Sequence, residues 1–376
     1  MKIIGMIAEY NPFHNGHIYH INEIKKKYPN SLLILILNGY FLERGEISVL
    51  SKEDKTKLAL ENKVDIVVEL PVLFGTQSAD TFAEKSLFLL NALKVEILIF
   101  GSESNNKEML WKLASEQVKS EFILNNSQKN LNYPKRINQS LQLDTTLPPN
   151  DLLGISYCKA ILKNHYKIEI ETIKRTNDYH DTTSCESVIS ATNIRAKKEK
   201  MEDISAYLPS KSLESWQAID TQKLFELLKY RILTDEHLDL YIDVTEGLDY
   251  KLKKEITKAN SFNELLTLLK SKRYTYNRLR RMLMHILLGH TKEKAHISIS
   301  YIHILGFSLK GKQYLKEKKK TFTLPTTVLK DDVIYQEEKK AALIYDLLTH
   351  SKSSLFDKQN KPIIYMGNGS KESNQK

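Results

Sequence analysis

Short apolar runs alternate with amphipathic stretches along the first 200 residues of the chain. The runs are typical of buried strands, and the stretches between them carry apolar residues at helical spacing. The predicted strands are Lys2–Ala8, Ser31–Leu37, Asp65–Glu69, Val95–Phe100 and Lys167–Ile173. The predicted helices are His17–Lys27, Lys52–Asn62, Ala79–Leu93, Lys107–Gln117 and Leu152–Asn164. This alternation predicts an α/β fold, in which helices cover both faces of a parallel sheet.

The pattern changes near Ser210, where glycine becomes sparse and leucines recur at helical spacing. We therefore expect the chain to divide into two domains and a tail. The expected parts are an α/β domain over residues 1–205, a mostly helical domain over residues 206–366 with short strands near His296–Ile304 and Ile363–Met366, and a disordered tail over residues 367–376.

Polar residues collect where three of the predicted strands end. They run from Glu9 to His17 after the first strand, from Asn38 to Gly45 after the second, and from Gly101 to Glu103 after a later one. Ligands of parallel α/β sheets bind beyond the carboxyl ends of the strands. We therefore expect these three segments to contribute to one binding site.

The first of these segments contains two histidines three residues apart, in His14-Asn15-Gly16-His17. They lie between a predicted strand and a predicted helix, where free backbone N–H groups and the helix dipole attract anions. Gly16 would let a phosphate approach the backbone closely. With 11 His and 13 Gly in 376 residues, chance produces His-x-Gly-His in about one such chain in 100. The motif predicts a nucleotide site, and two surface histidines are the alternative.

The motif resembles the HxGH signature of the nucleotidyltransferase superfamily, whose histidines contact the phosphates of ATP and stabilise charge at the α-phosphate. The longer string GMIAEYNPFHNGH, from Gly5 to His17, is similar to the tRNA(Met) cytidine acetate ligase family. The resemblance implies a Rossmann-like nucleotidyltransferase domain with His14 and His17 as catalytic residues. It also implies ATP contacts from Ile7, Ala8, Glu9, Tyr10, Asn11, Pro12, Phe13, His14, Asn15, Gly16, His17, Ile18, Tyr19 and His20.

A second phosphate motif follows in the order that the superfamily shows. The string ISATNIR, from Ile189 to Arg195, resembles the ISSTxIR pattern, with Ala191 in place of one serine. Ser190 is a good N-cap, and hydroxyl groups with a guanidinium at a helix start suit a triphosphate. The resemblance implies ATP contacts from Ser190 and Thr192, and an ordinary capped helix is the alternative.

Three single residues complete the ATP contacts that the resemblance implies. Gly101 follows a buried strand, and Arg175 follows the last predicted strand of the sheet. Asn150 lies in a segment similar to the family's SNDILG-like pattern, although Pro148-Pro149 stands where the family often has Gly-Ser. A tight turn, a solvated loop cation and a helix N-cap are the respective alternatives for Gly101, Arg175 and Asn150.

The segment from Asn38 to Glu46 resembles the family's GNFVQRGE loop, with Glu43 in place of the usual glutamine. Arg44 is the position in this loop that we expect to contact a phosphate or the tRNA. A solvated loop charge is the alternative for Arg44.

One basic segment stands out in the helical domain. Five cations and two tyrosines are interleaved from Ser271 to Arg281. Cations neutralise phosphates, and tyrosine rings can stack on unpaired bases. The candidate RNA-binding residues are Lys272, Arg273, Tyr274, Tyr276, Arg278, Arg280 and Arg281. Because they lie far from the phosphate motifs in sequence, we expect them to contact tRNA and to leave ATP chemistry unaffected; a charged helix face is the alternative.

The composition indicates which kinds of partner and which cellular compartment suit the chain. A net charge of +10 and a pI near 9.1 suit a polyanionic partner, nucleic acid first. Cys158 and Cys185 lack metal-ligand or redox spacing, which favours a reducing cytoplasm and no dedicated metal site. The sequence predicts no membrane-spanning helix and no secretory signal.

The resemblance implies an ATP-dependent ligase that activates acetate as acetyl-adenylate and forms N4-acetylcytidine at the wobble position of elongator tRNA(Met). Mg²⁺ would accompany ATP, and no obligate protein partner and no membrane partner are expected. Two alternatives remain open from the residues. One is a small-molecule adenylyltransferase of cofactor biosynthesis, which would not need the basic helical domain. The other is a non-catalytic RNA-binding protein, against which the intact HxGH motif argues.

Overall fold

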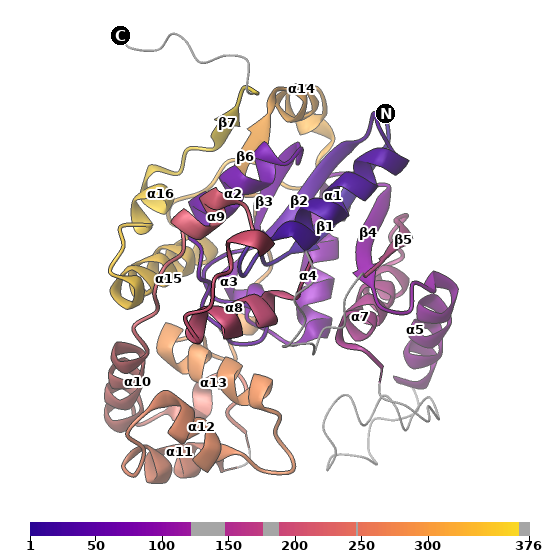
Figure 1. Ribbon diagram of the computed structural model, residues 1–376. Helices are drawn as coiled ribbons and strands as arrows, with labels where there is room; N and C mark the ends of the chain where they lie inside the picture. Colours follow the sequence, from indigo (N-terminus) through magenta and orange to yellow (C-terminus); the bar gives the residue numbers. More distant parts are fainter. Residues whose placement is uncertain (122–146, 176–187, 246, 368–376) are drawn as a thin grey trace.

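The computed structural model describes residues 1–121, 147–175, 188–245 and 247–367 (Figure 1). Its strands form a seven-stranded sheet in the order β5-β4-β1-β2-β3-β6-β7. The strands are β1 (Ile3–Ala8), β2 (Leu32–Asn38), β3 (Ile66–Leu70), β4 (Ile97–Ser102), β5 (Glu169–Lys174), β6 (Ile304–Ser308) and β7 (Ile363–Tyr365). The first five strands are mutually parallel where they pair, which confirms the predicted α/β fold.

The α-helices surround the sheet and extend beyond one end of it (Figure 1). They are α1 (Asn15–Lys27), α2 (Lys52–Glu61), α3 (Val72–Gly75), α4 (Ala79–Ala92), α5 (Lys107–Glu121), α7 (Pro149–Asn164), α8 (Ala191–Glu199), α9 (Ser210–Glu214), α10 (Thr221–Thr234), α11 (Leu248–Ile256), α12 (Phe262–Leu269), α13 (Tyr276–Leu288), α14 (Leu309–Lys318), α15 (Val333–Thr349) and α16 (Ser354–Gln359). No described helix is both long and apolar enough to span a bilayer.

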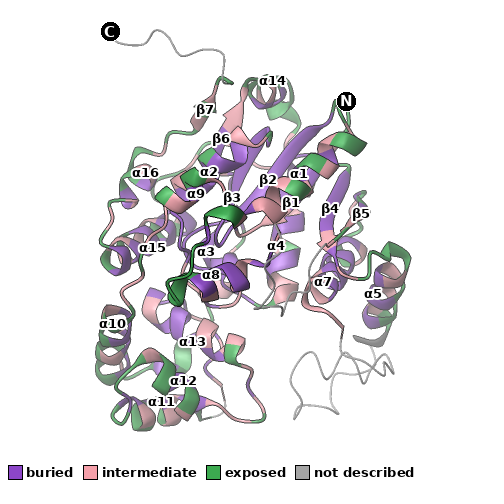
Figure 2. Ribbon diagram, viewed as in Figure 1, coloured by how far each residue is buried: buried purple, intermediate pink, exposed green. Residues whose placement is uncertain are grey.

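The apolar runs form strands because both of their faces are covered. All seven residues of β2 are buried. Leu32, Ile34 and Ile36 pack in one core with residues of α4 and α7. The alternate residues of β2 pack in a second core with residues of α1 and α2. Figure 2 shows the resulting buried strands beneath partly exposed helices.

The order of the strands creates a crevice at one end of the sheet. The chain passes from β1 to β2 and β3 on one side, and β4 and β5 then pair on the other side of β1. The connections after β1 and β4 run in opposite directions, which leaves a gap at the carboxyl ends of these two strands. Ligands of such sheets bind at this gap. The polar segments after β1, β2 and β4 therefore meet at this end.

The segment from residue 206 to residue 366 contributes both to a helical core and to the sheet of the N-terminal part. Helices α10 to α13 share a core with α15, but β6 and β7 extend the sheet of the N-terminal part. The predicted strand His296–Ile304 is wrong in its bounds: the strand is Ile304–Ser308, and it pairs antiparallel with β3. Its position depends on this long-range pairing rather than on its own weak apolar pattern. Cys185 and the tail from residue 368 lie outside the described residues, and so does His180, to which the sequence assigns no role.

Candidate active site

A cavity of about 910 Å³ lies at the crevice between β1 and β4. Its walls come from the ends of β1, β4 and β5, the starts of α1, α7 and α8, the loop after β2, and the start of α13. The cavity is thus built from the phosphate motifs and from the arginine-rich segment together.

The two histidines of the motif form a reciprocal capping box at the start of α1, in which each side chain accepts a hydrogen bond from a backbone N–H. His14 is the N-cap, and its Nδ1 accepts a hydrogen bond from the Gly16 N–H at 3.0 Å. In return, Nδ1 of His17 accepts from the His14 N–H at 3.1 Å. A neutral imidazole that accepts at Nδ1 carries its proton on Nε2. Both Nε2–H groups are therefore available as donors in a cavity that both residues line.

These imidazoles are neutral at physiological pH. Burial lowers the pKa of His14 to about 3, and the nearby Arg175 and Arg195 lower it further. Burial and the neighbouring His14 hold the pKa of His17 well below its usual range. Burial and Arg175 also lower the pKa of His20 to about 4. The positive charge of the site therefore comes from arginines, while the histidines contribute N–H donors.

Gly16 is required by the packing of the motif itself. A Cβ at this position would lie 2.7 Å from Cε1 of His14. Any side chain would displace the His14 imidazole, so Gly16 preserves the N-cap in addition to its predicted role toward phosphate. The two imidazole centroids are 3.9 Å apart.

Glu103 contacts two of the predicted ATP-binding residues, Asn150 and Arg175, beside β4 and β5. Its Oε1 accepts from Nδ2 of Asn150 at 2.5 Å and lies 3.8 Å from Nε of Arg175. The Arg175 side chain lies over Gly101, where a Cβ would be 3.3 Å from Cγ of Arg175. Asn150 is not an N-cap, because α7 begins at Pro149 and Pro148 occupies the cap position.

The second phosphate motif forms the start of α8. Ser190 is the N-cap, as predicted, and its Oγ accepts from the Asn193 N–H at 3.1 Å. Arg195 donates to the Asn11 carbonyl at 2.6 Å and to Oε2 of Glu46 at 2.9 Å. Arg195 thereby joins α8 to the turn before α1 and to the loop after β2.

Most of the predicted ATP contacts line the cavity. They are Ile7, Ala8, Glu9, Tyr10, Asn11, His14, Gly16, His17, Tyr19, His20, Gly101, Asn150, Arg175, Ser190 and Thr192. Pro12, Phe13, Asn15 and Ile18 are not among its lining residues. Phe13 is fully buried in the core, and Asn15 donates to the Ala206 carbonyl. These four residues belong to the turn and helix that carry the histidines, and their contact with ATP stays a prediction.

Comparison with known proteins assigns the family. The model of the HIGH Nucleotidyl Transferase family matches residues 1–362. The tRNA(Met) cytidine acetate ligases of Geobacillus sp. and Staphylococcus aureus are 39% and 35% identical, over 92% and 97% of this chain and 94% and 99% of theirs. The chain belongs to the tRNA(Met) cytidine acetate ligase family.

Solved structures of the family have the same fold. The apo structure of Thermotoga maritima TmcAL matches with a TM-score of 0.84 and 26% identity, over 97% of this chain and all of that chain. A structure of the same ligase bound with alpha-thio ATP matches with a TM-score of 0.80 and 27% identity, over 94% of this chain and 96% of that chain.

The arginine-rich segment of this ligase-family chain lies closer to the phosphate motifs than their separation in sequence indicates. Arg273, Arg278 and Arg281 line the same cavity as His14. Distance in sequence therefore does not separate these three arginines from the phosphate motifs in space, and their effect on ATP chemistry stays a prediction. Lys272, Tyr274, Tyr276 and Arg280 are not among the lining residues.

Tyr274 differs from its predicted role. The residue is only 7% exposed and belongs to the core of the helical part. The guanidinium groups of Arg278 and Arg273 lie 4.8 and 5.9 Å from the ring centroid. Stacking of Tyr274 on a base is incompatible with this burial, whereas Tyr276 is 44% exposed.

The loop after β2 connects the two parts of the cavity. Gly45 has a positive φ of 70°, and a Cβ there would collide with the backbone of Arg280 and Arg281. Glu43 lies beside it and pairs with Arg281 at 3.4 Å. Arg44 lines the cavity, as its predicted contact with a phosphate or tRNA requires.

Sequence reasoning missed two buried lysines of α2. Nζ of Lys55 donates to the carbonyl groups of Glu9, Asn38 and Gly39, which fixes the ends of β1 and β2. Burial lowers the pKa of Lys55 to about 7. Two lysines in an amphipathic pattern predict solvent exposure, so no local signal identifies this role.

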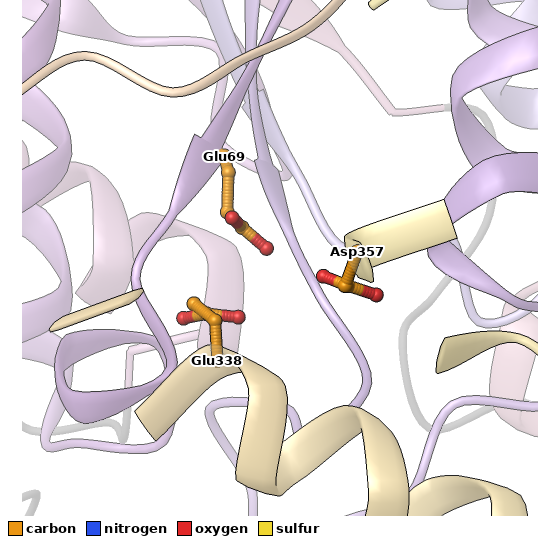
Figure 3. Close-up of side chains that lie close together, drawn as sticks. All are labelled: Glu69, Glu338 and Asp357. Atoms are coloured by element: carbon orange, nitrogen blue, oxygen red, sulfur yellow. The ribbon is translucent and has the colours of Figure 1, made fainter. Parts of the chain in front are cut away.

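The second lysine, Lys52, forms ion pairs within a buried carboxylate cluster. Glu69, Glu338 and Asp357 converge from β3, α15 and α16, at spacings that a metal ion could use (Figure 3). The Lys52 ammonium forms ion pairs with all three. The three carboxylates therefore already have a protein cation as their partner. These ion pairs join α15 and α16 to strand β3.

The position of the basic residues leads to a prediction about RNA affinity. Lys272→Ala with Arg280→Ala should weaken tRNA binding and flatten its salt dependence by about one unit of slope per lost phosphate contact. Acetate-dependent ATP–pyrophosphate exchange should fall much less, because neither residue lines the cavity. Filter binding across a salt series measures the tRNA affinity and its salt dependence. Unchanged affinity and slope would exclude these two residues from the RNA interface.

Proposed function

We propose that this chain is an ATP-dependent ligase that acetylates the wobble cytidine of elongator tRNA(Met) through an acetyl-adenylate. The supporting observation is a single cavity shared by the two imidazoles of the HxGH motif and the arginines at the start of α13. An ATP site alone would not require those arginines, and an RNA surface alone would not require the imidazoles. ATP and tRNA as substrates also favour a cytoplasmic enzyme.

In the proposed first step, an acetate oxygen attacks the α-phosphorus of ATP. The bond to the bridging oxygen breaks, and pyrophosphate leaves with the electron pair. Negative charge grows on the phosphate oxygens as this happens. The groups that would stabilise it are the neutral N–H donors of His14 and His17, the helix N-termini of α1 and α8, and the Arg175 guanidinium.

In the proposed second step, the N4 amine of cytidine attacks the acetyl carbonyl carbon. A C–N bond forms, the bond from carbon to the phosphate oxygen breaks, and AMP leaves. A wobble base lies in a single-stranded loop, so reaching the cavity requires little unstacking. Arg273, Arg278 and Arg281 line the cavity and would neutralise the phosphates of such a loop.

Mg²⁺ fits this site as a companion of ATP. Among the described residues, the one group of three carboxylates with metal-ligand spacing is Glu69, Glu338 and Asp357, and all three are ion-paired with Lys52. The cavity therefore provides cationic and N–H groups for phosphates, and phosphate oxygens would hold most of the coordination of Mg²⁺. Mg²⁺ would supply further charge neutralisation on the triphosphate.

The acceptor separates this proposal from its alternatives. Purified protein would be incubated with ATP, Mg²⁺ and labelled acetate, and offered either bulk tRNA or a panel of small amines and nucleotides. We expect label in acid-insoluble RNA, on cytidine after digestion. Adenylyl transfer to a phosphorylated metabolite without acetate would favour the small-molecule adenylyltransferase. RNA binding without any ATP turnover would favour the non-catalytic protein.

A further inference from the structure

The cavity contains five carboxylates, and four of them have cationic partners. Glu46 pairs with Arg195, Glu43 with Arg281, and Asp243 with Arg278 and Arg281. Asp80 pairs with Lys159. Among the described residues, the fifth carboxylate, Glu9, has no cation within ion-pair distance; the nearby Lys55 donates to the Glu9 backbone carbonyl and interacts with the carboxylate only through space. A cation next to a carboxylate stabilises its charge and makes it a weaker base, so Glu9 differs chemically from the other four.

Neutral groups hold Glu9 by one oxygen only. Its Oε1 accepts from Nδ2 of Asn38 at 2.9 Å and from the Glu43 N–H at 2.7 Å. The residue lines the cavity, and its Oε2 has no protein donor among the described residues. Burial raises the pKa of Glu9, with smaller contributions from Glu43 and Glu46, which is the direction that favours a proton acceptor.

The hydrogen bonds of Glu9 fix it from a different side of the cavity than three of the other predicted ATP contacts. Glu9 follows β1 and is fixed from the β2 side, through Asn38 and the loop that carries Glu43. Gly45 of that loop packs against the backbone of Arg280 and Arg281. Gly101, Asn150 and Arg175 lie on the opposite side, around β4 and β5. Glu9 is therefore on the side of the cavity that faces the proposed tRNA-binding segment.

We propose that Oε2 of Glu9 binds the N4 amino group of the target cytidine and accepts its proton during acetyl transfer. This inference rests on the proposed function and assigns the base of its second step. The lone pair of the N4 nitrogen is delocalised into the ring, so the amine is a poor nucleophile until it loses a proton. As the C–N bond forms and AMP leaves, one N4 proton passes to Glu9 and then to solvent. A carboxylate is also the usual acceptor for this amino group.

Glu9→Gln tests the assignment because glutamine preserves the local structure. Its Oε1 can accept the same two hydrogen bonds, while an NH₂ group replaces Oε2 and can accept neither the amine nor its proton. The full-length variant would be loaded with ATP and labelled acetate. Acetate-dependent ATP–pyrophosphate exchange and trapping of the adenylate by hydroxylamine report the first step. Single-turnover transfer of label to tRNA reports the second.

We expect transfer to tRNA to fall by about 100-fold or more, and exchange and hydroxamate formation by less than about tenfold. Glu9→Asp keeps a carboxylate and should transfer faster than Glu9→Gln. Asp80→Asn is the matched control, because it removes another carboxylate of the cavity, one that is paired with Lys159 and contacts neither Glu9 nor the arginines. It should change both steps by less than about threefold.

Two outcomes would overturn the assignment. Transfer by Glu9→Gln at the wild-type rate would exclude Glu9 as the base. An equal fall in exchange and transfer would place Glu9 in ATP binding or in the fold. A wild-type protein that catalyses no acetate-dependent exchange would instead refute the proposed function, so the two failures are distinguishable.

Discussion

His14→Ala and His17→Ala should each lower acetate-dependent ATP–pyrophosphate exchange by about 10²–10³-fold at saturating ATP. In the proposed first step, each imidazole would present one Nε2–H to the negative charge that grows on the α-phosphate. Losing one preorganised donor of this kind typically costs that factor in rate. The exchange assay isolates the first step, so tRNA binding does not enter the measurement.

Alanine also removes the reciprocal capping of α1, which costs about 1 kcal/mol of stability for an N-cap residue. His14→Asn and His17→Gln separate this effect from catalysis. Asparagine is a strong N-cap, and glutamine at the third helical position can return a hydrogen bond to the cap backbone. Both variants should melt near the wild-type temperature and still lose exchange. Near-normal exchange in either variant would refute the role of that histidine at the α-phosphate.

The strands and helices of the N-terminal part could be predicted closely because their burial is encoded locally. Continuous apolar runs such as that of β2 are characteristic of strands covered on both faces, and the five predicted strands end within two residues of the observed ones. β6 could not be located in this way. It lies at residues 304–308 because it pairs with β3, far away in sequence.

The phosphate motifs could also be predicted, because each lies at a strand-to-helix junction whose chemistry is local. The relations between motifs could not. Hydrophobic spacing does not indicate that Gly45 is seated on the backbone of α13, or that Arg278 and His14 line one cavity. Nor does it separate Lys52, which is fully buried, from Lys57 on the same helix, which is largely exposed. These properties depend on which distant segments pack together.

Lys52→Met should lower the free energy of unfolding by about 3–5 kcal/mol, because it leaves three buried carboxylates without their cation. The wild-type cluster is balanced by Lys52, whose pKa is held well above its usual range by Asp357, Glu69 and Glu338. Lys57→Met on the same helix is the control. It breaks an exposed pair with Glu53 and should cost at most about 0.5 kcal/mol.

The loss caused by Lys52→Met should also depend on pH in a defined direction. Even with Lys52 present, burial raises the pKa of Glu338 and of Asp357, and removing the cation raises them further. A carboxyl group whose pKa is higher in the folded state destabilises that state above the unfolded pKa, and the penalty disappears as the pH falls. Urea unfolding at pH 8 and at pH 5 should therefore show a smaller loss at pH 5. A loss that is equal at both pH values, or no larger than that of Lys57→Met, would show that the three carboxylates do not need Lys52.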